Sequence, residues 1–228
     1  MKTTLITLAA ILAAAATAHA QIDVSNIKSI TVNKSASNAA VTGTREIGRS
    51  SLECVYKAVA PERGNEQEPV RMKEDRMILQ TGGAVSKFYS YYNFAKDSLL
   101  KADPNNALKA VEHKNGTAAC LYTGYPEAGR LTLTDAVAST YYTYEDKVPQ
   151  IKWTIGDQTR EILGYKCRRA DCDLYGRHFT AWFTDEIPVA SGPWKLQGLP
   201  GLIMAAADDE GLYSFEIIGL RSVERPVE

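Results

Sequence analysis

A glycine- and proline-rich stretch between residues 191 and 207 constrains the fold more than any other part of the chain. It reads S-G-P-W-K-L-Q-G-L-P-G-L-I-M-A-A-A. Pro200 fixes its own φ near −65° and Gly201 tolerates a positive φ, so this pair predicts a type II turn over residues 199–202. The apolar run that begins at Leu202 is typical of a buried strand. The stretch therefore predicts a rigid loop that leads into a core strand.

The same loop has a second interpretation, as a recognition surface with Trp194 at its tip. An aromatic ring held by a loop of few conformations suits binding, because little conformational entropy is lost when a partner docks. Both interpretations stay open at the level of the sequence. The candidate residues for such a surface are Trp182, Gly192, Pro193, Trp194, Leu199, Pro200 and Gly201.

Alternating apolar and polar residues predict antiparallel β structure through most of the chain. Strands are expected at Leu52–Tyr56, Arg71–Gln80, Thr117–Thr123, Arg130–Thr134, Ser139–Glu145, Ile151–Ile155, Thr159–Cys172, Arg177–Thr184, Leu202–Ala207 and Tyr213–Leu220. We expect the first two to pair as a hairpin, and Gly156-Asp157 and Leu174-Tyr175-Gly176 to form tight connections. The predicted fold is mainly β (α+β), with a curved antiparallel sheet or half-barrel.

One segment changes its period and interrupts the strands. Between Phe94 and Asn115, Asp103-Pro104 is a typical helix start, and Leu108 and Val111 lie three residues apart on one face. We expect one or two short inserted helices here. Tyrosine is also frequent, with twelve residues that concentrate in Y-S-Y-Y-N-F from Tyr89 and T-Y-Y-T-Y from Thr140. Half-buried strands explain these runs, and a binding face for glycan, peptide or lipid is the alternative.

The first twenty residues have the pattern of a secretory signal peptide. Lys2 precedes an apolar run from Leu5 to Ala16, and Ala18-His19-Ala20 is an A-x-A cleavage site. The run is shorter than the roughly 20 apolar residues of a spanning helix, and no cysteine follows it. We therefore expect cleavage after Ala20 and a periplasmic or secreted product. A flexible segment at 21–47 and a single β-rich domain at 48–228 would follow.

The charge balance argues against two classes of partner. The chain carries 26 basic and 27 acidic residues, without a long block of like charge. Nucleic acids and anionic membranes both require a concentrated basic surface. We predict neither as a partner and expect no membrane span once the signal peptide is removed.

Four cysteines, Cys54, Cys120, Cys167 and Cys172, are disulfide candidates in an oxidising compartment. Three pairings are possible. If Cys167 and Cys172 lie on one strand, their Cα atoms are about 16 Å apart, whereas a bridge allows at most about 7 Å. This favours bridges from Cys54 and Cys120 to the other two. A zinc site is the alternative, although C-x4-C is not zinc-finger spacing.

Catalytic patterns are missing from the sequence. Apart from His19, the chain has only His113 and His178, without an H-E-x-x-H run or a G-x-S-x-G elbow. Carboxylates at Asp185-Glu186 and Asp208-Asp209-Glu210 leave a hydrolase open as an alternative. However, adjacent strand residues point to opposite faces, and the second group is typical of a solvated turn. We predict no catalytic residue, metal or cofactor.

Several motifs together resemble one bacterial family. They are R-M-I-L-Q-T-G-G-A-V-S-K-F-Y-S from Arg76, I-L-G-Y-K-C-R-R-A from Ile162, T-A-W-F-T-D-E-I-P from Thr180, and G-L-P-G-L-I from Gly198. The chain resembles the GLPGLI family over roughly residues 50–220. This family comprises uncharacterised envelope proteins of Gram-negative bacteria, so the resemblance implies a location and no established activity.

The sequence thus favours an exported binding or assembly protein of the cell envelope over an enzyme. An unknown envelope protein, glycan or lipid would be its partner. By analogy with lipoprotein-carrier half-barrels, transport of an apolar ligand such as lipid is an alternative. A carboxylate-dependent hydrolase is the remaining one.

Overall fold

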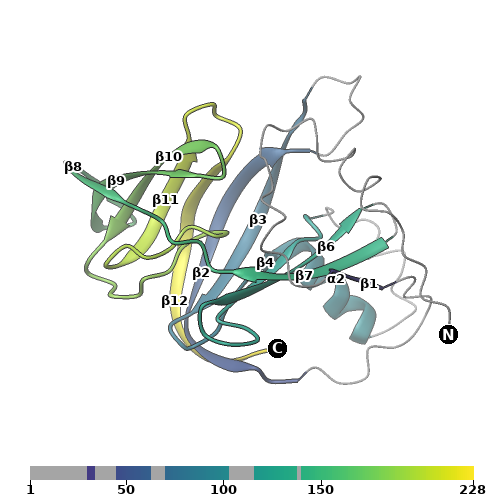
Figure 1. The fold of residues 1–228 in the computed structure, drawn as a ribbon. Helices are drawn as coiled ribbons and strands as arrows, with labels where there is room; N and C mark the ends of the chain where they lie inside the picture. The colour runs from purple at the N-terminus through teal and green to yellow at the C-terminus, as the bar shows by residue number, and fades with distance from the viewer. Residues whose placement is uncertain (1–29, 34–44, 63–69, 103–115, 138–139) are drawn as a thin grey trace.

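The fold is known from a computed structural model that describes residues 30–33, 45–62, 70–102, 116–137 and 140–228. These residues form one curved antiparallel sheet of twelve strands (Figure 1). The strands are β1 (Ile30–Asn33), β2 (Gly48–Pro61), β3 (Met72–Thr81), β4 (Ser86–Ser90), β5 (Cys120–Thr123), β6 (Arg130–Val137), β7 (Thr140–Lys147), β8 (Thr154–Ile162), β9 (Tyr165–Leu174), β10 (Arg177–Thr184), β11 (Leu202–Asp208) and β12 (Ser214–Val227).

The C-terminal strand connects the N-terminal and C-terminal halves of the sheet. The strand order runs β1-β7-β6-β5-β4-β3-β2-β12-β11-β10-β9-β8, so the last strand lies between β2 and β11. β2 and β12 pair from Gly48 with Val227 to Val59 with Ser214. The prediction of a mainly β protein with a curved antiparallel sheet and an inserted helix is confirmed.

The hairpin predicted from the first two alternating segments is present. β2 and β3 pair from Leu52 with Thr81 to Pro61 with Met72. On β2, the alternating residues Leu52, Cys54 and Tyr56 are buried in the core. Period-two burial of one face thus sets the register of this pair.

One predicted strand is in fact a hairpin. Residues 159–172 were expected to be continuous, but β8 ends at Ile162 and β9 begins at Tyr165. The turn between them has φ of 50° at Leu163 and 83° at Gly164, as a two-residue hairpin turn requires. Gly156-Asp157, predicted as a connection, instead lies in β8 where the register with β9 shifts.

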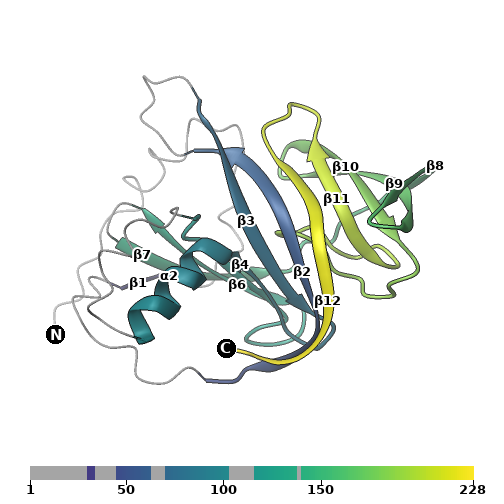
Figure 2. The same ribbon diagram turned by 180° about the vertical axis from the view of Figure 1, so that it is seen from behind.

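A helix is inserted after β4 and covers part of the sheet's convex side. Helix α2 (Tyr91–Ala102) begins before the predicted segment, because the Ser90 hydroxyl group caps it by accepting a 3.5 Å hydrogen bond from the Asn93 amide. It contacts β3 and β4 (Figure 2). The centre of the Phe94 ring lies 5.7 Å from that of the Tyr89 ring. The start predicted at Asp103-Pro104 lies outside the described residues.

The tyrosine runs divide between structures. Tyr89 is on β4, whereas Tyr91 and Tyr92 open α2, so the first run is not a strand throughout. The second run lies on β7, as expected. β1, which pairs with β7, lies inside the segment predicted to be flexible. The predicted signal peptide is outside the described residues.

Candidate functional site

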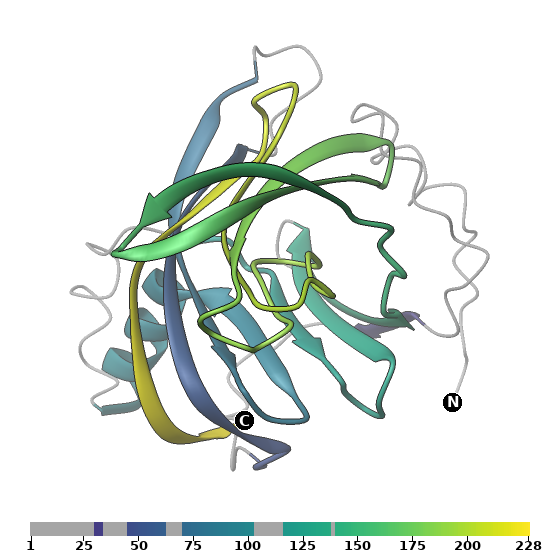
Figure 3. The same cartoon turned by 90° about the vertical axis from the view of Figure 1, so that its left-hand side faces the viewer.

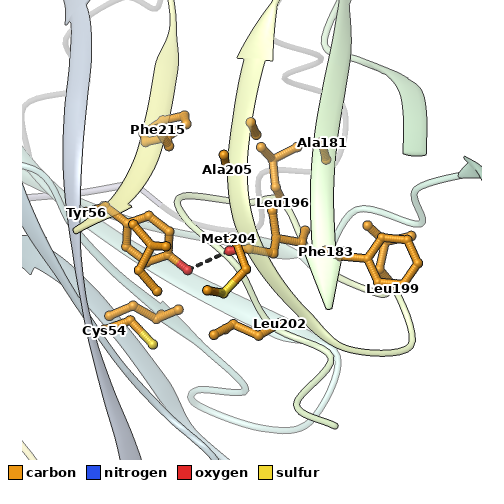
Figure 4. Packing of buried hydrophobic residues seen from close by; sticks show 14 of the residues in the cluster. Cys54, Tyr56, Ala181, Phe183, Leu196, Leu199, Leu202, Met204, Ala205 and Phe215 are labelled. Atoms are coloured by element: carbon orange, nitrogen blue, oxygen red, sulfur yellow. Dashed lines mark hydrogen bonds between the residues drawn. The ribbon is translucent and has the colours of Figure 1, made fainter. Parts of the chain in front are cut away.

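The segment between β10 and β11 fills the concave side of the sheet. It folds back into the space that the strands surround (Figure 3). Leu196 and Leu199 are 0% and 1% exposed, and they join the core formed by β2, β10 and β11 (Figure 4). We call residues 185–201 the signature segment. The segment leads directly into the buried strand β11, as predicted, and its rigidity stays a prediction.

Hydrogen bonds fix the signature segment at several points. The Leu202 amide donates to the Ile187 carbonyl group at 3.0 Å, and the Ile203 amide donates to Ser191 at 3.0 Å. From outside the segment, the Trp153 indole donates to the Gln197 carbonyl group at 2.8 Å. The segment is therefore part of the folded core and not a free loop.

Two signature glycines are required by close packing. A Cβ atom at Gly201 would lie 2.0 Å from the Thr184 carbonyl oxygen, and one at Gly192 would lie 2.7 Å from that of Leu196. The predicted type II turn is wrong, because positive φ occurs at Gly198 (90°) and not at Gly201. Close approach of two backbones, and not turn geometry, explains Gly201.

The seven predicted binding residues are divided by the structure. Gly192, Pro193, Leu199 and Gly201 are buried, Pro200 is exposed, and both tryptophans are partly buried. Trp194 does not stand at a free tip, since its ring packs 5.8 Å from Tyr175 and 6.4 Å from Phe179. Trp182 lies on β10, and the Arg160 guanidinium carbon lies over its indole ring, 4.6 Å from the ring centre. Direct binding by these residues stays a prediction.

The convex face of β8–β10 carries a connected polar network that the sequence analysis missed. The Arg169 guanidinium group donates to both carboxylate oxygens of Asp171 at 2.9–3.1 Å, to Gln158 at 2.9 Å and to Thr180 at 3.3 Å. Thr180 donates in turn to Asp171 at 2.7 Å. Partial burial opposes ionisation of Asp171, but the hydrogen bonds from Arg169 and Thr180 outweigh it and lower its pKa.

His178 extends this network toward the hairpin turn. Its Nδ1 atom lies 2.9 Å from Asp173, and this hydrogen bond raises the pKa of His178 above 6.5. On β9 the network residues alternate with Ala170, Cys172 and Leu174, which are buried in the core. The alternation of R-A-D-C-D with polar residues outward was the available signal for this face.

The two groups of acidic residues considered for hydrolysis are held apart. Asp185 lies 3.6 Å from Arg168 and directly follows Thr184. Asp208 pairs with Phe179, which is six positions before Asp185 and thus about 20 Å away along the strand. Asp208 is buried and not part of a solvated turn, because it accepts a 2.8 Å hydrogen bond from Arg177. Glu186 accepts a bond from the Lys166 amide. Asp185 and Glu186 are thus separated from the second group, whereas Asp208 and Glu210 lie together, because both accept hydrogen bonds from Arg177, at 2.8 and 2.6 Å.

The four cysteines are present as free thiols. Two strands separate Cys54 on β2 from Cys120 on β5, and three separate it from β9, which carries Cys167 and Cys172. Neighbouring strands are about 4.8 Å apart, so such pairs are out of reach along the sheet. The structure thus contains no disulfide among its described residues, which differs from the prediction.

The described part of the chain contains neither a metal-binding cluster nor a membrane-spanning helix. There, no group of three or more His, Cys, Asp or Glu side chains could hold a metal ion. No helix within the described ranges is long and apolar enough to cross a membrane. His113 lies outside these ranges.

One family model matches the part of the chain that contains the signature segment. Residues 175–205 match the family described as "Protein of unknown function (Porph_ging)". The match begins in the β9–β10 turn and ends in β11, so it contains the whole signature segment. It does not carry the GLPGLI name. No curated protein matches the chain.

The fold is similar to part of a larger solved protein. The structure of PNGF-II in the C2 space group is 13% identical with a TM-score of 0.53, over 78% of this chain and 28% of that chain. The structure in the P21 space group gives 12% identity and a TM-score of 0.50, over 78% and 29%. At this identity the likeness concerns the fold alone, and this chain spans less than a third of PNGF-II.

Proposed function

We propose that the protein is a non-catalytic binding or assembly protein of the bacterial cell envelope and a member of the GLPGLI family. The signal-peptide pattern at residues 1–20 supports export to the periplasm or beyond. The string G-L-P-G-L-I at residues 198–203 supports the family. Within this string, Leu199, Gly201, Leu202 and Ile203 are buried, which gives these four residues a packing role.

The observation that carries the proposal is the polar network on the convex face of β8–β10. Arg169, Asp171 and Thr180 hold one another in fixed geometry on a rigid sheet. Groups fixed in this way lose little entropy when a partner docks, and their charges select complementary polar surfaces. We infer that this face binds a polar envelope partner, either protein or glycan.

The alternatives receive less support. An acyl chain would need apolar space on the concave side, where the side chains of Leu196 and Leu199 already pack. A carboxylate-dependent hydrolase would need two carboxylates about 5–10 Å apart in one pocket. Asp185 and Asp208 lie at opposite ends of the same strand pair, and the close pair Asp208 and Glu210 is engaged by the Arg177 guanidinium group.

A pull-down from envelope extracts tests the proposal. Baits are the mature chain from Gln21 and the variants Arg169→Gln, Trp194→Ala and Lys57→Gln. Lys57 belongs to an exposed ion pair with Glu74 on β2 and β3, and it serves as the matched control. We expect a partner that the mature chain and Lys57→Gln retain and Arg169→Gln loses. Treatment of the extract with protease or glycosidase distinguishes protein from glycan.

Two outcomes would contradict the proposal. Equal recovery with Arg169→Gln would show that the network does not bind the partner, and loss only with Trp194→Ala would assign binding to the signature segment. If no bait captures a partner, an envelope-binding function is not supported.

A further inference from the structure

Lys195, which follows Trp194 in the signature segment, is a buried lysine enclosed by aromatic rings. It is 8% exposed, and its Nζ atom lies 4.7 Å from the ring centre of Tyr175, 5.7 Å from Trp194 and 5.8 Å from Tyr144. It donates a 3.3 Å hydrogen bond to the Tyr175 hydroxyl group. No carboxylate of the described residues forms an ion pair with it.

Burying an ammonium group without a carboxylate partner is unfavourable, and here it lowers the pKa of Lys195, although Asp146 acts in the opposite direction. Aromatic faces are the groups that offset this penalty, because the ring quadrupole attracts a cation within about 6 Å. All three rings meet this distance. The arrangement therefore has the chemistry of an ammonium-binding site.

Two of the three aromatic residues have a left-handed backbone conformation, which residues other than glycine rarely adopt. Tyr175 has φ of 51° and Trp194 has φ of 53°. Tyr175 occupies the first position of a two-residue hairpin turn, where Asn, Asp or Gly is favoured. A tyrosine in this conformation has a conformational cost. The contact of its ring and hydroxyl group with Lys195 explains why a tyrosine is nevertheless found there.

The rings come from distant parts of the sheet. Tyr144 is on β7, second from one end of the strand order, whereas Tyr175 follows β9, second from the other end. We propose that Tyr144, Tyr175 and Trp194 form an ammonium-binding box, that Lys195 is its resident ligand, and that the box fastens the signature segment to β7 across the concave side. This inference does not rest on the proposed function.

Chemical rescue of Lys195→Ala in the full mature chain tests the box. The variant removes the ammonium group and leaves the rings in place. We expect ethylammonium chloride to raise its midpoint of thermal unfolding in a saturable way, relative to sodium chloride at equal ionic strength. Wild type, whose box is filled, should respond equally to both salts. Identical midpoints of the variant in the two salts would overturn the proposal.

The same variant tests the fastening of the sheet. Amide hydrogen exchange in β7 and the signature segment should be faster in Lys195→Ala than in wild type, and ethylammonium should slow it again. Unchanged exchange in β7 would show that the box does not hold the two ends together.

A double-mutant cycle keeps the proposal testable if Lys195→Ala does not fold. Lys195→Met retains the apolar stem and removes only the charge. Tyr144→Leu should raise the equilibrium constant for unfolding in both backgrounds. The fold increase should be about three times smaller in Lys195→Met than in wild type. Tyr141→Leu, at a neighbouring exposed ring on β7, is the control and should act equally in both backgrounds. Equal effects of Tyr144→Leu in the two backgrounds would contradict the box.

Discussion

The hydroxyl group of Tyr56 donates a 2.7 Å hydrogen bond to the backbone carbonyl group of Ile203, and both residues are fully buried (Figure 4). Tyr56 is on β2 and Ile203 is on β11, with β12 between them in the sheet. Burial also raises the pKa of Tyr56 well above 10.0, so the hydroxyl group remains a donor at neutral pH. This bond ties the end of the signature string to the longest strand pair of the sheet.

Tyr56→Phe should therefore destabilise the protein without changing its shape. The substitution keeps the ring and removes the donor, which leaves the buried carbonyl group of Ile203 without this hydrogen bond. We expect a loss of about 1–3 kcal/mol in the free energy of unfolding, measured by urea denaturation. Tyr141→Phe, at an exposed ring, should change it by less than about 0.5 kcal/mol. Equal effects of the two variants would show that the Tyr56 bond contributes nothing specific.

Gly201→Ala should be far more damaging than an alanine substitution at another glycine in the same sheet. The added Cβ atom would lie 2.0 Å from the Thr184 carbonyl oxygen, so the backbones of the signature segment and β10 must separate. We expect a loss of about 3 kcal/mol or more in the free energy of unfolding. A Cβ atom at Gly219 on β12 meets nothing within 4 Å, and Gly219→Ala should leave stability unchanged or slightly higher. A tolerated Gly201→Ala would refute the packing role.

His178 should titrate at a higher pH than an ordinary histidine. Its hydrogen bond with Asp173 raises its folded-state pKa above 6.5, and the nearby Asp171 and Asp209 charges act in the same direction. The stabilising contribution of protonated His178 is thus complete below the unfolded-state pKa and is lost as pH rises through the folded-state value. NMR titration of the imidazole measures this shift, and Asp173→Asn should lower the pKa. An unchanged pKa in Asp173→Asn would rule out this hydrogen bond as the cause.

The cysteines should be unreactive thiols in the folded protein. Burial raises the pKa of Cys54 and Cys172 to about 12 and that of Cys167 to about 11, so almost no thiolate is present at pH 8. We expect slow alkylation by iodoacetamide in buffer, and addition of four groups in non-reducing urea, as measured by intact mass. Addition of no group in urea without reductant would instead establish the two disulfides predicted from the sequence.

Strands with one buried face could be predicted from the sequence, because such a face requires apolar residues at every second position. Alternation at Leu52, Cys54 and Tyr56 identified the β2–β3 hairpin, because one face of it is buried in the core. The β8–β9 turn was missed because Leu163 is not a typical turn residue, even though it adopts a positive φ. Gly201 was singled out correctly but for the wrong reason, since its close neighbour Thr184 is identified only by the fold.

The contacts of the candidate sites could not be predicted for a related reason. Lys195 meets Tyr144 and Tyr175, which are 51 and 20 positions away in the sequence, and only the curvature of the sheet brings them together. The Arg169–Thr180 contact depends on the register of β9 and β10, in which Thr180 lies opposite Asp171. That register requires the turn at Tyr175-Gly176 to be placed correctly, after which alternation predicts the polar face.

Amide hydrogen exchange at Leu202 and Ile203, the first two residues of β11, tests most directly whether the signature segment that they bond to is core scaffold or an accessible loop. The Leu202 and Ile203 amides donate to the carbonyl groups of Ile187 and Ser191 in the signature segment. We predict that both exchange as slowly as the β2 amides of the core, through global unfolding only. Exchange of both amides as rapid as that of the exposed Glu210 amide would contradict the account and restore the signature segment as a free recognition loop.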